Sequence, residues 1–164
     1  MPSISIVDDL LYPRDKIEIK FSGENVASIC NLIRPILERV LQVEAKDTYE
    51  RLLKWDSTSN PRSFYNEWTT NKEEDKWTAY SFKIIIKGNQ DTNTKKGNVS
   101  IEIYSWLRTS YEYSNFIQRF LWTLYNQIFY YKRRREYIER GKWLTFQLRD
   151  EIMKALNIPK IAEE

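Results

Sequence analysis

Residues 129–143, FYYKRRREYIERGKW, place four consecutive cations between aromatic side chains. Arginine and lysine bind phosphates or carboxylates, and aromatic rings stack on bases, so this combination is typical of a surface for nucleic acid or an acidic protein. Residues 130–142 carry a net charge of +4, and the rest of the chain carries −1 of the total of +3. The positive excess is therefore local, and it also suits the negative end of a helix dipole without any partner.

A helical projection of the region divides these residues between two faces. We predict that one face lies on the rest of the protein and carries Ile117, Leu121, Leu124, Ile128, Tyr131 and Ile138. The opposite face and its borders supply the candidate partner-binding residues, which are Arg119, Trp122, Phe129, Tyr130, Arg133, Arg134, Tyr137 and Arg140. Because Trp122 and Phe129 make this far face partly apolar, something must cover it. The final helix folding back is the first expectation, and a second copy or a foreign partner are the alternatives.

Other polar groupings have ordinary structural explanations. Asp91 and Asn93 are spaced as in the start of a calcium loop, but Lys95 and Lys96 occupy positions where oxygen ligands or glycine are needed. The acidic run 73–75 is predicted to be a solvated loop. Cys30 lies on the apolar stripe of a predicted helix, away from its N-terminus, which indicates a core residue and not a nucleophile.

Several catalytic frameworks are excluded by composition. The chain has no histidine and one cysteine, so a Cys/His zinc site within one chain is impossible. Its four glycines are too scattered to form a phosphate-binding loop or a dinucleotide fingerprint. We therefore expect a protein that is not an enzyme and that uses no cofactor or metal.

The elements that would position these residues follow from periodicity. Alternating apolar and polar residues predict strands, and apolar residues at helical spacing predict helices. The predicted strands are 16–21, 48–56, 64–70, 76–88 and 98–108. The predicted helices are 26–43, kinked or split at Pro35; a long one from a capping box at 109–112 to about Arg140; and 142–157, after a break or cap at Gly141 and ended by Asn157 and Pro159.

The resulting order, β-α-β-β-β-β-α-α, predicts an α+β fold. We expect an antiparallel meander sheet covered by the kinked first helix and the long C-terminal helix, with a final helix in addition. The chain is predicted to be a single domain, 1–164, with tails at 1–15 and 158–164. This order of elements resembles that of the TATA-binding-protein half-domain and, more loosely, of helix-grip folds and cystatins.

The leading functional hypothesis is a binding module that uses the basic, aromatic helix end to contact nucleic acid or an acidic protein. One alternative is a carrier that holds an apolar small molecule between sheet and helices, as helix-grip folds do, because the predicted strands and loops carry Trp55, Trp68, Trp77 and Trp106. Another is a homodimeric structural protein, and a membrane surface is a further partner. The sequence shows no signal peptide and no transmembrane segment, so we expect a cytoplasmic protein.

Overall fold

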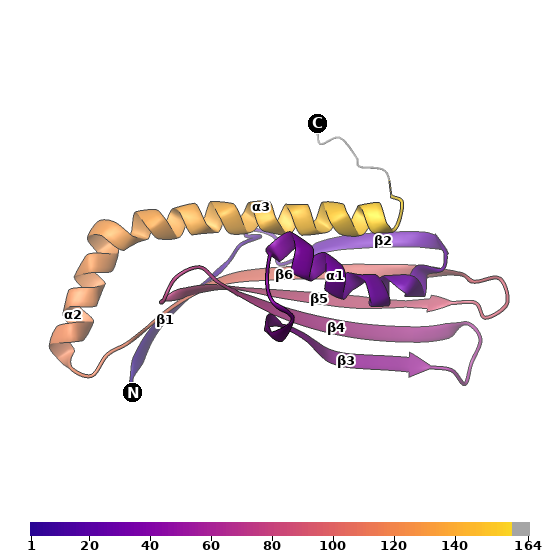
Figure 1. Ribbon diagram of the computed structural model, residues 1–164, viewed down its shortest axis with the longest axis horizontal. Helices are drawn as coiled ribbons and strands as arrows, with labels where there is room; N and C mark the ends of the chain where they lie inside the picture. The colour runs from indigo at the N-terminus through magenta and orange to yellow at the C-terminus, as the bar shows by residue number, and fades with distance from the viewer. Residues whose placement is uncertain (159–164) are drawn as a thin grey trace.

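The computed structural model describes residues 1–158 and contains one antiparallel sheet of six strands (Figure 1). The strands are β1 (Ser3–Asp9), β2 (Ile17–Glu24), β3 (Thr48–Asp56), β4 (Arg62–Glu73), β5 (Thr78–Gln90) and β6 (Lys96–Glu112). β3 to β6 form a consecutive meander, and β1 and β2 pair with opposite ends of β6. The predicted α+β class and meander are thus confirmed.

The first residues of the chain differ from the prediction, because 3–9 form a strand and not a tail. β1 pairs along the end of β6, from Ser3 opposite Glu112 to Asp9 opposite Trp106. This pairing extends β6 through 109–112, so the predicted capping box there is wrong. Thr109 is fully buried in the sheet, where its backbone pairs with both β1 and β5. Pairing with neighbouring strands has overridden the local helix-start pattern.

One helix, α1 (Ile29–Leu41), follows the 3-10 turn η1 (Val26–Ser28) and covers part of the inner face of the sheet. Its buried residues recur at helical spacing: Ile29, Ile33, Ile36, Leu37 and Leu41. The helix is continuous through Pro35, so the alternative of two short helices is wrong. Proline removes one backbone donor but leaves this side of the helix packed against the sheet.

The C-terminal region is one long helical segment with an irregular turn inside it. It comprises α2 (Phe116–Tyr125), the π-helical turn η3 (Asn126–Tyr130) and α3 (Tyr131–Ala155). α2 starts later than predicted, because the Asn115 side chain caps it by accepting the N–H of Gln118, at 2.9 Å. At the other end Asn157 adopts a left-handed conformation, and Ile158 N–H bonds the Met153 carbonyl at 2.9 Å. The predicted end at Asn157 is confirmed, and Pro159 lies outside the described residues.

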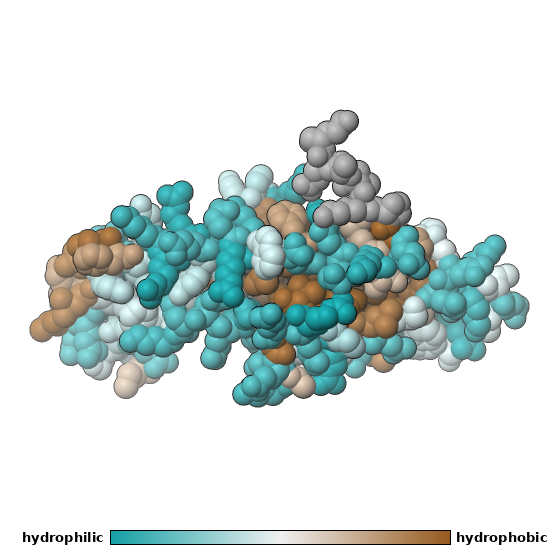
Figure 2. All heavy atoms as spheres, turned by 45° about the horizontal axis from the view of Figure 1, so that its top comes forward, coloured by the Kyte–Doolittle hydropathy of each residue, from teal (hydrophilic) through white to brown (hydrophobic). Residues whose placement is uncertain are grey.

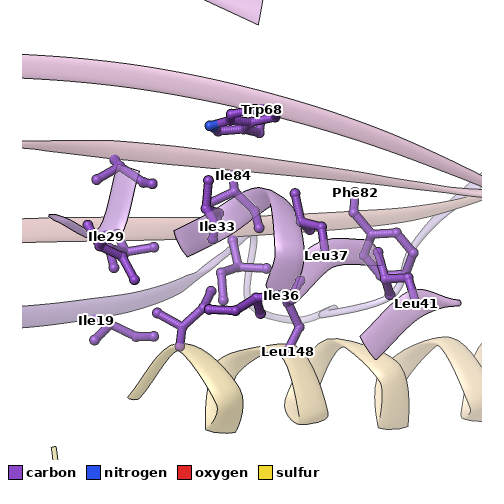
Figure 3. Packing of buried hydrophobic residues seen from close by; sticks show 14 of the residues in the cluster. Ile19, Ile29, Ile33, Ile36, Leu37, Leu41, Trp68, Phe82, Ile84 and Leu148 are labelled. Carbon is purple, nitrogen blue, oxygen red and sulfur yellow. The ribbon is translucent and has the colours of Figure 1, made fainter. Parts of the chain in front are cut away.

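Gly141 lies inside α3, so the predicted break and separate final helix are wrong. A side chain at this position would meet Leu10 Cδ1 at 2.6 Å and Tyr80 Cε1 at 2.8 Å. The glycine therefore lets α3 approach β5 closely instead of ending the helix. Beyond it, Leu144, Leu148 and Ile152 join the core, and Leu148 lies beside Ile36 of α1 (Figure 3).

Candidate partner-binding surface

α2 leaves the axis of α3 at η3 and lies across one end of the sheet (Figure 1). Its inner side is marked by Trp122, Asn126 and Tyr130, which are spaced by four. Trp122 is 5% exposed and Tyr130 is 1% exposed. A π-helical turn holds more residues than an α-helical one, which keeps residues four apart on the same side. The fold-back predicted to cover Trp122 is therefore wrong, because the sheet itself covers it.

Aromatic side chains at the end of the sheet hold Trp122 in place. Tyr111 of β6 stacks on the Trp122 ring at 5.2 Å between centroids. Trp77, in the turn between β4 and β5, meets Trp122 edge-on at 6.5 Å and Tyr130 at 5.3 Å. Such aromatic pairs each add to the free energy gained from burial. The two predicted candidates Trp122 and Tyr130 are thus part of the protein's own packing.

Asp75 connects the turn between β4 and β5 to the start of α3. Its Oδ2 accepts hydrogen bonds from the hydroxyls of Tyr130 at 2.7 Å and Tyr137 at 3.1 Å. Its Oδ1 accepts the backbone N–H groups of Trp77 at 2.8 Å and Thr78 at 2.9 Å. Burial opposes ionisation of this carboxyl, but the four donors outweigh it, so the pKa of Asp75 is lowered. The prediction of a solvated acidic loop is wrong for Asp75, because two of its donors, Tyr130 and Tyr137, come from a helical segment that is remote in the sequence.

Arg134 also points into the protein. Its guanidinium forms an ion pair with Asp8, and its Nε donates to Thr109 Oγ1 at 3.0 Å. Its side chain is 12% exposed. Arg140 forms a more exposed ion pair with Glu74, at 3.2 Å. Arg134, predicted to bind a partner, is thus paired with an acid that β1 supplies.

The remaining predicted candidates stay accessible. Phe129 and Arg133 are exposed, and Arg119 lies over the ring of Tyr113 at 5.6 Å. Lys132 and Arg135 are exposed as well. The basic stretch is therefore divided, with three cations at the surface and Arg134 bound internally.

Of the face predicted to lie on the sheet, Ile138 packs against the core, but the other five residues are exposed: Ile117, Leu121, Leu124, Ile128 and Tyr131. Exposed fractions run from 41% for Leu124 to 77% for Phe116. We call this surface the outer face, and it consists of Phe116, Ile117, Phe120, Leu121, Leu124 and Ile128. Its aromatic rim consists of Tyr125, Phe129 and Tyr131. Figure 2 shows apolar surface gathered at the end of the molecule where α2 lies.

The area of the outer face and its rim exceeds what a monomer usually exposes. With about 200 Å² for a large apolar or aromatic residue, the exposed fractions amount to about 1,000 Å². The largest apolar patch of a typical monomer is about 300–600 Å², and larger patches mark binding sites. The sequence predicts that this helix is apolar on two sides. The side that it predicts to face the sheet is the exposed one. The pattern that indicates the inner side is the row of polar atoms on Asn126, Tyr130 and Arg134, which are spaced by four.

Elsewhere, the polar groups are engaged with each other. Glu102 on the outer side of the sheet is buried, yet hydrogen bonds from Lys16, Lys87 and Tyr104 lower its pKa to about 2. The carboxylate of Asp91 accepts the N–H groups of Asn93 and Thr94. Burial raises the pKa of the Cys30 thiol to about 11. Among residues 1–158, no three His, Cys, Asp or Glu side chains are grouped so that they could hold a metal ion.

No protein-family model matches the chain, and no curated protein matches it either. Within the described part, no helix combines the length and the hydropathy that a transmembrane crossing requires.

Proposed function

We propose that this protein is a non-catalytic binding module whose partner covers the outer face of α2 and η3. The observation that carries the proposal is the exposure of six large apolar side chains on one helix face, at the end of the molecule. Leaving such surface in water is unfavourable by about 25 cal/mol per Å², so covering it would drive association. The surrounding structure holds the face outward through Trp122, Tyr130 and Asp75.

The outer face is better supported as the binding surface than the basic stretch alone. Two of the six cations in 130–142, Arg134 and Arg140, have acidic partners on other elements, Asp8 and Glu74. Lys132, Arg133 and Arg135 remain exposed beside the outer face. They extend the binding surface and bias it against cationic partners.

A carrier of an apolar small molecule has less support. Side chains of α1 and α3 lie directly on the inner side of the sheet, where Ile33, Leu37 and Leu148 have exposed fractions of 0–1% (Figure 3). Trp77 packs against Trp122, and Trp55 stacks on Phe64 at 5.7 Å between ring centroids. The tryptophans that motivated a carrier thus have structural contacts.

Site-specific photo-crosslinking tests the proposal. A photoreactive residue replaces Leu121 in one variant and Leu53 in another, because these leucines are 56% and 55% exposed and Leu53 lies on β3, away from α2. We expect covalent adducts from position 121 in cells and few from position 53. If neither protein nor lipid adducts depend on position 121, the outer face binds nothing and the proposal fails.

A further inference from the structure

We infer that the partner on the outer face is a second copy of this chain, which packs its own α2 and η3 against the first in a two-fold symmetric helix pair. The inference rests on the proposed function and names its partner. It goes beyond the exposure of the face, because exposure alone does not distinguish a protein, a lipid surface or a nucleic acid.

The spacing of the exposed residues suits a helical partner. Ile128 in η3 and Tyr131 at the start of α3 extend the apolar row beyond α2. Within α2, Ile117, Leu121 and Leu124 follow each other at intervals of four and three. This is the pattern of the apolar seam in coiled coils, in which each side chain enters a gap between four residues of the facing helix. All five are exposed, so no part of residues 1–158 covers this row.

The charge distribution allows the face to meet its own copy. In a two-fold symmetric interface the same patch lies on both sides, so any charge near the axis would meet a like charge. Residues 116–131 contain a single charged side chain, Arg119, and it lies over the Tyr113 ring and outside the seam. The cations begin at Lys132, beyond the seam. A helix that lies on an anionic membrane would instead carry several Lys or Arg residues on its polar face, beside the apolar one, and α2 carries only Arg119.

The area agrees with a stable dimer. The outer face and its rim expose about 1,000 Å², and a standard specific interface buries about 800 Å² on each partner. The outer face and its rim together therefore supply one half of such an interface. No other segment of the chain has to move to complete it.

Sedimentation velocity of the full-length chain over a range of concentrations tests the inference. We expect a species of twice the chain mass that dissociates on dilution. Leu121→Glu and Leu124→Glu each place a carboxylate in the seam and should raise the dimer dissociation constant more than about 100-fold. The matched variant Leu53→Glu should leave it within about threefold, because its substituted side chain lies on β3. Circular dichroism of each variant verifies that the exposed substitutions leave the fold intact.

Two outcomes would overturn the inference. One is a dimer that Leu53→Glu disrupts and Leu121→Glu does not, which would place the interface on the free edge of β3. The other is a wild-type chain that stays monomeric at every concentration. In that case flotation with vesicles containing anionic lipid separates the two proposals. Flotation that Leu121→Glu abolishes overturns the second copy but retains a binding role for the outer face. Absence of flotation, together with absence of protein adducts from position 121, removes both.

Discussion

The two halves of the long C-terminal helical region place their apolar residues on opposite sides. In α3, Leu144, Leu148 and Ile152 point toward the sheet and α1. In α2, the residues facing the sheet carry polar atoms, and the purely apolar side chains face outward. Trp122 Nε1 and Asn126 Oδ1 are even buried without a hydrogen-bond partner in the described part of the chain.

This difference shows that hydrophobicity alone did not determine how α2 packs. If α2 only had to cover the end of the sheet, the protein would gain more free energy by turning Leu121 and Leu124 inward. The observed orientation keeps those leucines available, and the aromatic and hydrogen-bonded contacts on the inner side hold it in place. α3 therefore stabilises the fold, and α2 presents a surface.

The largest expected difference between α3 and α2 is in the unfolding free energy of a matched pair of leucine variants. Leu148→Ala in α3 should lower the free energy of unfolding by about 2–5 kcal/mol, because it leaves a cavity in the core. Leu121→Ala in α2 should change it by less than about 0.5 kcal/mol at concentrations where the chain is monomeric. Urea denaturation followed by circular dichroism measures both. Equal losses would mean that the outer face is packed within the monomer.

Two neighbouring arginines near the start of α3 test the same difference between inward-facing and exposed side chains. Arg134→Ala removes the contacts with Asp8 and Thr109 and should cost about 1–3 kcal/mol of unfolding free energy. Arg133→Ala, next to it in sequence and exposed, should cost less than about 0.5 kcal/mol. The same urea titration measures the pair. A large loss in Arg133→Ala would show that the basic stretch stabilises the fold as a whole.

The smallest expected effect is a dependence on pH. Because the folded pKa of Asp75 lies below its unfolded value of about 3.9, its carboxylate stabilises the fold above that pH, and this contribution is lost as the pH falls through the folded pKa. Asp75→Asn should therefore flatten the fall in unfolding free energy below about pH 4. Thermal melts of Asp75→Asn and of the wild type at pH values from about 2 to about 7 measure this difference. Tyr130→Phe is the control, since it keeps the carboxylate and removes one donor.

Local patterns in the sequence predicted the parts of the fold in which each element has one buried side. Strands β2, β5 and β6 were found from their alternation, and α1 from its apolar stripe. β1 was not predicted although residues 3–6 alternate between serine and isoleucine, and its partner β6 is remote in the sequence. Gly141 was taken for a break, because its role depends on Leu10 and Tyr80, which are remote in the sequence.

The orientation of α2 could not be predicted by the same reasoning. A helical projection assigns the most apolar side to the core, and here that side is exposed. The residues that decide the orientation act through distant partners, namely Tyr130 through Asp75 and Arg134 through Asp8. The sequence does show that this helix is apolar on two sides, but of the pair predicted to need cover only Phe129 is exposed, and Trp122 is buried.

The π-helical turn has a consequence for how such a chain can change over time. In an uninterrupted α-helix, each residue added or removed turns everything beyond it by about 100°. The π-helical turn η3 instead accommodates an extra residue at the point where the two helix axes diverge. Tyr130 anchors the start of α3 through its hydrogen bond to Asp75. Substitutions in α2 could therefore alter what the protein recognises while the packing of α3 stays the same. Under the proposed function, stability and recognition are encoded in adjacent stretches of one helical segment and can evolve separately.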